Sequence, residues 1–107
     1  MNRINLLQSF LNEDPGDAFS KYALALEFGK EGNIIKAISL LTELQTENIS
    51  YLPTYYQLGQ FLEKANEKNT ALQTYYKGVE VALIADNNHT AAELRTAIEL
   101  LLENMED

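Results

Sequence analysis

The sequence predicts an all-α protein, a solenoid of about six antiparallel helices that forms one domain of 107 residues. A period of 34 residues relates two stretches, because sliding the chain back by that length places Leu58 on Leu24 and Ala71 on Ala37. Apolar residues recur at spacings of three and four within each stretch, and polar or glycine-containing turns separate the runs. A fixed period that keeps apolar and small residues at matching positions is typical of stacked helical repeats.

Composition and charge narrow the classes of partner. Apolar residues make up 46% of the chain and aromatic residues 9%, which is enough for a packed core. The formal net charge is -8, from 16 acidic and 8 basic side chains, so the phosphates of nucleic acid would be repelled. The longest apolar run, Val81 to Ala85, is too short to span a bilayer, and the N-terminal residues do not resemble a secretory signal. We therefore expect a cytoplasmic protein with neither a nucleic-acid nor a membrane partner.

Residues 1–14 contain the first expected helix. Ile4, Leu7, Phe10 and Leu11 share one face, and the turn that begins at Asp14 ends this helix and starts the next. The register of the repeat makes it the second half of an incomplete repeat. Its apolar stripe should cover the following helix, because the end of a solenoid has no neighbouring repeat to bury it.

The first full repeat is expected at residues 18–51, and its first helix is apolar on two sides. Leu24 lies on one side, whereas Phe19, Tyr22 and Leu26 lie on the opposite side. Such a helix is either sandwiched between neighbours or lines a binding surface. Both alternatives stay open for Phe19 and Leu26, whereas the hydroxyl of Tyr22 favours an exposed edge. The turn at Gly32 then leads into the paired helix.

The second full repeat is expected at residues 52–85. Pro53 fits the first turn of its first helix, where the missing N–H costs nothing. Asn66 stands at the turn position that Gly32 occupies one period earlier, and asparagine also adopts the left-handed conformation. Gly78 costs about 1 kcal/mol relative to alanine inside the paired helix, which indicates a closely approaching neighbour.

Small residues at matching positions predict close crossings within each pair of helices. Ala37 and Ala71 are expected to face Ala25 and Gly59, respectively, because antiparallel helices joined by a short turn pack closely where side chains are short.

A final helix is expected within residues 88–107, where it caps the solenoid. Asp86 to His89 reads as a polar turn, and Thr90 with Glu93 matches a capping box. The expected core stripe of this helix consists of Leu94, Ala97, Ile98, Leu101 and Met105. Leu100 lies off that stripe and is either an ordinary exposed leucine or a contact residue.

The sequence offers little for catalysis. His89 is the single histidine and there is no cysteine, so a metal would depend on a weak pair with Asp86, and a polar turn explains that pair better. Glu27 and Glu31 lie one helical turn apart, but Lys30 beside them favours a surface charge cluster over an acid/base pair. We expect a protein that is not an enzyme and that has no cofactor and no metal.

One stretch resembles a known repeat family. Tyr55-x-x-Leu58-Gly59-x-x-Leu62, followed by Ala71-x-x-x-Tyr75, is similar to the tetratricopeptide repeat, which reads aromatic-x-x-Leu-Gly-x-x-Tyr and then Ala-x-x-x-Phe. The first repeat departs from the pattern, with Lys21 at the aromatic position and Leu44 where a smaller residue is usual. The resemblance implies a small bacterial-type two-repeat unit with flanking capping helices, folded as a right-handed superhelix.

The resemblance also implies a function. In this family the first helix of each pair lines a concave groove that binds peptides or partner proteins. Some members grip a terminal carboxylate with lysine and asparagine on this face, but Tyr22, Leu26, Tyr56 and Gln60 stand at the corresponding positions here. The residues expected to line the groove are Phe19, Tyr22, Leu26, Lys30, Pro53, Tyr56, Gln60, Glu63 and Lys64.

Two functions of different class follow from this pattern. The first is a protein-interaction module, an adaptor or scaffold that holds a peptide or protein segment in the groove. The alternative is structural self-assembly into a weak homo-oligomer through Leu100, the acidic last helix or an incompletely covered first helix.

Overall fold

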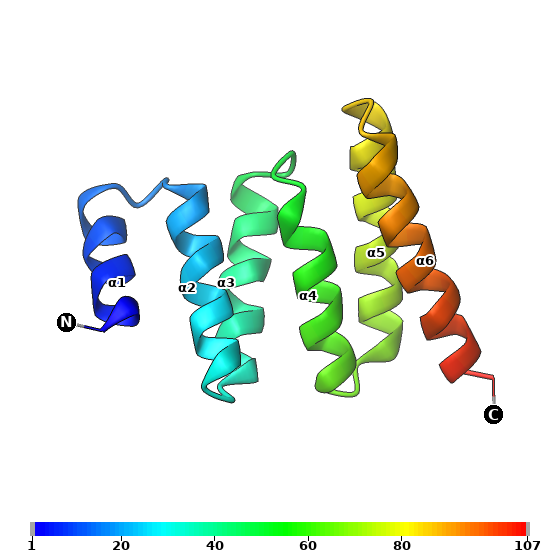
Figure 1. The fold of residues 1–107 in the computed structure, drawn as a ribbon, viewed down its shortest axis with the longest axis horizontal. Coiled ribbons are helices and arrows are strands. Elements are labelled where there is room, and N and C mark those ends of the chain that lie inside the picture. Colours follow the sequence, from blue (N-terminus) through cyan, green and yellow to red (C-terminus); the bar gives the residue numbers. More distant parts are fainter. Residues whose placement is uncertain (1, 107) are drawn as a thin grey trace.

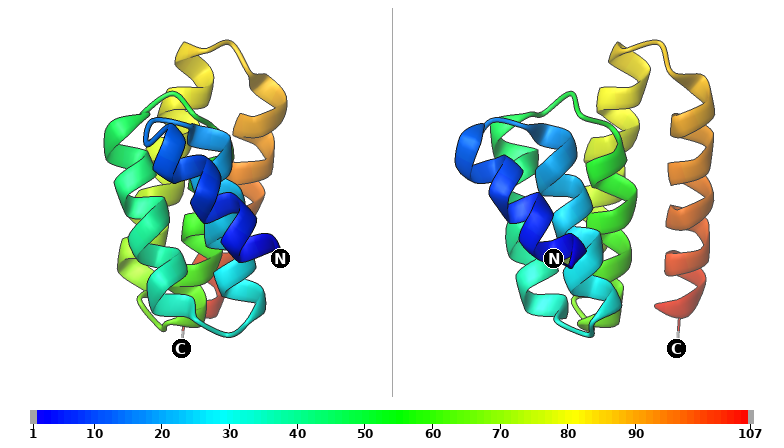
Figure 2. Two further views of the ribbon diagram at one scale, coloured as in Figure 1. Left: turned by 90° about the vertical axis from the view of Figure 1, so that its left-hand side faces the viewer. Right: turned by 60° about the vertical axis from the view of Figure 1, so that its left-hand side comes forward.

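Six α-helices follow one another in the computed structural model, which describes residues 2–106 and contains no strand within that range (Figure 1). They are α1 (Arg3–Glu13), α2 (Ala18–Lys30), α3 (Ile34–Glu47), α4 (Pro53–Lys64), α5 (Lys68–Ile84) and α6 (Asn88–Asn104). Successive helices run antiparallel and pack on one another, and α2 also touches α4. The helices lie side by side in a stack that ends in α6 (Figure 2), which confirms the predicted all-α superhelix.

The ends of the helices follow from their local sequence. The side chains of Asn2, Asp17 and Asn33 accept hydrogen bonds from backbone N–H groups of the first turns of α1, α2 and α3. Pro53 occupies the first turn of α4, as predicted. Left-handed residues follow three of the helices: Gly32 has a φ of 85°, Asn66 of 61° and Asp86 of 58°. The predicted equivalence of Asn66 and Gly32 is therefore confirmed.

The start of α6 differs from the prediction. The side chain of Asn87, not that of Thr90, caps the helix by accepting a hydrogen bond from the backbone N–H of Thr90 at 3.0 Å. The capping box of Thr90 and Glu93 is therefore wrong, and Asn88 and His89 belong to the helix rather than to a turn. An asparagine competes well for the cap position, and it lies three residues earlier than the threonine.

The core runs along the inside of the stack. Tyr55, Leu58, Tyr75 and Leu94 bring α4, α5 and α6 together. At the N-terminal end α1 covers α2, with Leu7 and Leu11 packed against Ala23 and Leu24. Two residues placed on core stripes lie at the surface instead, since Phe10 is 43% exposed and Met105 is 37% exposed.

Lys21, the departure from the aromatic pattern, is accommodated by ion pairs. The equivalent residue of the second repeat is Tyr55, which is buried and whose hydroxyl donates a hydrogen bond to the backbone oxygen of Ile49 at 2.6 Å. Lys21 is also buried, and its Nζ lies 2.8 Å from Oε1 of Glu47 and 3.6 Å from Oε1 of Glu43. Its aliphatic stem therefore replaces part of the ring while its charge reaches two carboxylates on α3.

Gly59 and Gly78 each lie where a neighbouring helix approaches closely. A Cβ added to Gly78 would lie 2.6 Å from Cβ of Tyr55 and 2.8 Å from Cδ1 of Leu94, which confirms the predicted close neighbour. A Cβ added to Gly59 would lie 2.0 Å from the ring of Tyr75. The three atoms nearest to that Cβ all belong to Tyr75, so its ring lies closest to Gly59, and the predicted facing of Ala71 and Gly59 stays a prediction. A glycine here makes room for a ring.

Replacing Gly59 with alanine is expected to destabilise the fold by up to about 2 kcal/mol. Alanine favours a helix interior by about 1 kcal/mol over glycine, but overpacking typically costs about 1–3 kcal/mol or more. The steric term wins because the Tyr75 ring is fully buried and cannot move away. Urea unfolding of Gly59→Ala would measure the loss. Gly16→Ala is the control, because its added Cβ would meet its nearest neighbour at 3.6 Å, and equal stability of the two variants would contradict the packing.

Candidate functional site

Three adjoining hollows lie along the face formed by α2, α4 and α6. The first, of about 580 Å³, lies where residues of all three helices meet, and the second, of about 490 Å³, lies between α4 and α6. The third, of about 380 Å³, lies between α2 and α4. Tyr56 borders all three. Together they form one surface, which we name the concave groove.

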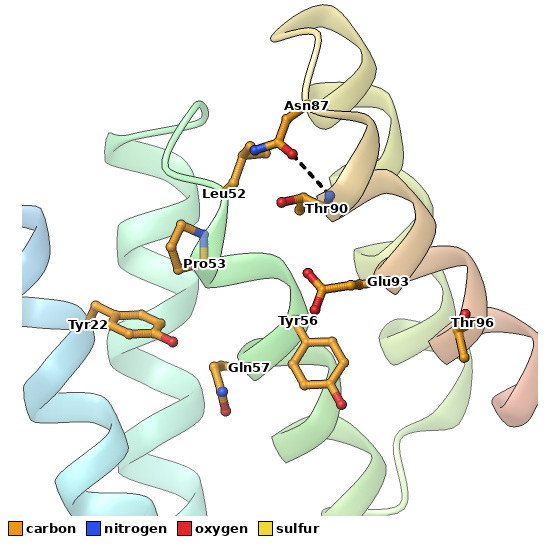
Figure 3. Close-up of a pocket in the computed structure, with 9 residues that line it drawn as sticks. All are labelled: Tyr22, Leu52, Pro53, Tyr56, Gln57, Asn87, Thr90, Glu93 and Thr96. Carbon is orange, nitrogen blue, oxygen red and sulfur yellow. Dashed lines mark hydrogen bonds between the residues drawn. The ribbon is translucent and has the colours of Figure 1, made fainter.

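Each of the three helices contributes to the concave groove. The residues of α2 that line it are Tyr22, Leu26, Gly29 and Lys30. Those of α4, together with Leu52 just before it, are Leu52, Pro53, Tyr56, Gln57, Gln60, Phe61, Glu63 and Lys64. Those of α6, together with its cap residue Asn87, are Asn87, Thr90, Glu93, Thr96, Ala97, Leu100, Glu103 and Asn104. Figure 3 shows Tyr22 and Glu93 pointing toward the space over α4 from either side.

The structure brings together most of the residues selected from the sequence. Those that line the concave groove are Tyr22, Leu26, Lys30, Pro53, Tyr56, Gln60, Glu63 and Lys64. Phe19 does not line any of the three hollows, although it is 59% exposed, so neighbouring helices do not bury it. Leu26 is half-buried and packs against the core while it borders the third hollow. The part these residues play in binding stays a prediction.

The two tyrosines of the groove differ in how they are held. Tyr22 is half-buried, and its ring meets that of Tyr51 edge-on with 5.9 Å between centroids. Burial raises the pKa of Tyr22 above that of a free tyrosine, so its hydroxyl keeps its proton and can donate a hydrogen bond. Tyr56 is 43% exposed, and its ring lies 6.5 Å from that of Tyr75, tilted by 39°. Both rings therefore offer fixed apolar surface with a polar tip.

Tyr75 of α5, a core residue, holds Gln60 and Glu63 in position by hydrogen bonds. The side-chain amide of Gln60 donates to the Tyr75 hydroxyl at 2.7 Å, and that hydroxyl donates to Oε2 of Glu63 at 2.5 Å. Burial, together with the neighbouring Glu63 carboxylate, raises the pKa of Tyr75 well above its ordinary value. The hydroxyl therefore stays protonated and holds both groove side chains.

The lysines at one end of the groove already have partners. Nζ of Lys30 lies 3.6 Å from Oε2 of Glu27, which also pairs with Arg3, as expected for a surface charge cluster. Nζ of Lys64 lies 5.7 Å from the centre of the Phe61 ring, within reach of a cation–π contact. Glu93 and Glu103 line the opposite wall, on α6.

Residues 2–106 contain no group of three or more histidine, cysteine, aspartate or glutamate side chains placed to hold a metal ion. The His89 side chain is 86% exposed, and its Nε2 lies 3.7 Å from Oε1 of Glu93. None of the helices described by the structure combines the length and the apolar character needed to cross a membrane.

The sequence interpretation missed the contribution of α6 to the groove. Glu93, Thr96, Leu100 and Glu103 recur at spacings of three and four, and they lie on the face opposite the buried stripe. That periodicity was the signal that could have found them. Leu100, which is 59% exposed, belongs to the same groove as Tyr56 rather than to a separate surface.

Comparisons with known proteins identify solved structures that share this fold. No family model and no curated protein matches the chain. The solution structure of a tetratricopeptide repeat domain protein from Salinibacter ruber is 36% identical, with a TM-score of 0.79 over 82% of this chain and 89% of that one.

More distant structures share the fold at low identity. The type III secretion translocator chaperone SycD of Yersinia enterocolitica is 13% identical, with a TM-score of 0.86 over 97% of this chain and 72% of that one. PcrH, solved in complex with the chaperone-binding region of PopD, is 13% identical, with a TM-score of 0.87 over 96% of this chain and 78% of that one.

Proposed function

The chain belongs to the tetratricopeptide repeat family, whose members are protein-interaction modules, and from this premise we propose that its concave groove binds a peptide or an exposed segment of a partner protein. The observation that carries the proposal is the groove itself, three hollows joined at Tyr56 and lined from three helices. The fold is typically non-catalytic, and we propose that the chain works as an adaptor or scaffold.

The make-up of the groove suits a protein segment. The rings of Tyr22 and Tyr56 supply large contact areas, and rigid tyrosines lose little conformational entropy when they bind. Gln60 and Glu63, held by Tyr75, supply fixed hydrogen-bonding groups. PcrH, which has the same fold, holds a region of another protein, so the fold is compatible with this role. Carboxylates on the α6 wall oppose a nucleic-acid ligand.

Truncating either groove tyrosine is expected to weaken partner binding. A partner recovered from an extract of the native cell would be titrated by calorimetry against the Tyr22→Ala and Tyr56→Ala variants. Each should lose on the order of 1–2 kcal/mol, a five- to thirtyfold rise in Kd, because aromatic anchors commonly dominate binding energy.

The matched control is Tyr76→Ala. Tyr76 is 51% exposed on α5 and does not line any of the three hollows of the groove. All variants are compared at equal helicity by circular dichroism. Undiminished binding by both groove variants would count against the proposed site.

Self-assembly is a second candidate, favoured by apolar side chains exposed on the two terminal helices. Leu6 and Phe10 of α1 are 40% and 43% exposed, and Leu102 of α6 is 39% exposed. A light-scattering mass of the purified protein separates the two functions without a partner. A monomer at high concentration favours the adaptor, whereas a dimer or larger assembly that Phe10→Ala dissolves favours self-assembly.

A further inference from the structure

The α6 wall of the concave groove has a pattern of its own. Glu93, Thr96, Leu100 and Glu103 follow one another along the helix on the side that faces α4. Glu103 stands ten positions after Glu93, which corresponds to about 15 Å along the helix at 1.5 Å per residue. The wall therefore presents a carboxylate near each end with an apolar side chain between them.

These two carboxylates are not neutralised within the protein. Among residues 2–106, no lysine or arginine lies within ion-pair distance of Glu93 or Glu103. The contact of Glu93 is with His89, whose side chain is 86% exposed. By contrast, Lys30 pairs with Glu27, and Lys64 lies over the Phe61 ring. The hollow between α4 and α6 is lined by the carboxylates of Glu63, Glu93 and Glu103 and by no lysine or arginine, so its charge is negative, and two of its three carboxylates stand on α6.

The hollow bordered by this wall offers two accessible apolar side chains among its polar ones. Tyr56 and Leu100, which are 43% and 59% exposed, border the same hollow as Glu93 and Glu103. This placement separates the two glutamates from Glu99, which lies on α6 but does not line the groove. A ligand that rests on Tyr56 and Leu100 would meet the carboxylates at its two ends.

We propose that the segment bound in the concave groove is cationic and amphipathic, with an apolar side chain over Tyr56 and Leu100 and a lysine or arginine directed at each of Glu93 and Glu103. This inference rests on the proposed function and specifies the chemistry of the partner. A helical segment would carry its basic residues about ten positions apart, and an extended one about four to five apart at 3.3 Å per residue.

The test is a selection that does not presume the ligand. A phage-displayed library of random 15-residue peptides is panned against the 107-residue chain. We expect the enriched peptides to carry at least two basic residues flanking an aliphatic or aromatic one. Binding of a synthetic copy should weaken as ionic strength rises, because attraction between accessible charges is screened by salt.

Variants then locate the charge. Glu93→Gln with Glu103→Gln should weaken binding of that synthetic peptide about threefold to tenfold, the range expected for losing two accessible ion pairs. Glu99→Gln with Glu106→Gln changes the net charge equally outside the groove and should leave the Kd unchanged. Thermal melting of both double variants checks that the fold is intact.

The outcomes separate this inference from the function on which it rests. Peptides without a basic preference that still lose binding in Tyr56→Ala would overturn the inference and leave the groove function standing. An equal loss in the two double variants would also overturn it, because general attraction to an acidic protein would then explain the selection. If binding of the enriched peptides does not depend on Tyr56, the proposed function fails as well.

Discussion

Ending the chain after Asp86, which removes α6, is expected to abolish cooperative folding. Leu94, Ile98 and Leu101 are buried between α6 and the rest of the protein. Burying a leucine or isoleucine side chain contributes about 1.5–3 kcal/mol, so these three contribute roughly 5–9 kcal/mol. Small domains are stable by only about 5–15 kcal/mol in total. The truncated chain should therefore lose helicity or aggregate, as circular dichroism and light scattering would report.

Two comparisons make this truncation informative. Ending the chain after Asn104 removes only residues beyond the last helix and should leave the thermal melt unchanged. Leu94→Ala alone should cost about 2–5 kcal/mol, since it removes a fully buried side chain from the same interface. A chain ending at Asp86 that stays monomeric, fully helical and sharply melting would contradict the capping role of α6.

Most of the fold could be predicted because its signals are local. Helix boundaries follow from Pro53, Gly32 and Asn66, each of which has a backbone preference that acts within one turn. The apolar spacing of α3 and α4 is equally local. Each of these features depends on residues that are close together in the sequence, and the packing of the stack is consistent with them.

The α6 wall could not be predicted from the 34-residue period. The paired helix of the first repeat, α3, has 14 residues, whereas α5 has 17. Although α6 begins as many residues after α4 as α4 begins after α2, the position one period after Leu58 is the exposed Ala92 and the buried residue is Leu94, so sliding the α4 pattern by 34 residues misaligns it with α6. The amphipathic pattern of α6 was visible, with Leu94 and Leu101 on one face and Leu100 on another. That pattern does not show whether the face of Leu100 lines a groove or is simply exposed to solvent.

The crossing at Gly59 could not be decided from sequence for a different reason. Ala71 and Tyr75 are four residues apart, so both lie on the face of α5 that packs on α4. Which of them lies closest to Gly59 depends on how far one helix slides along the other. That offset is set by the packing of the whole pair, and it selects the ring of Tyr75.

Replacing Tyr75 with alanine is expected to destabilise the protein by about 3–5 kcal/mol, the usual cost of truncating a buried aromatic side chain. The ring is fully buried, fills the space above Gly59 and carries the hydroxyl that binds Gln60 and Glu63. Tyr75→Phe keeps the ring and loses only the hydrogen bonds, of which the one from Gln60 contributes about 0.5–1.5 kcal/mol and the one to the Glu63 carboxylate about 1.5–3 kcal/mol. Urea unfolding of the two variants therefore separates packing from hydrogen bonding.

The Tyr75→Ala substitution is expected to reverse the effect of alanine at position 59. Without the Tyr75 ring, an added Cβ no longer meets the atoms that now lie 2.0–2.7 Å from it. Gly59→Ala should then follow helix propensity and stabilise the Tyr75→Ala background by about 1 kcal/mol, although it destabilises the wild type. A double-mutant cycle measures this reversal as the coupling between the two positions. An equal cost of Gly59→Ala in both backgrounds would mean that the Tyr75 ring does not cover Gly59 in solution.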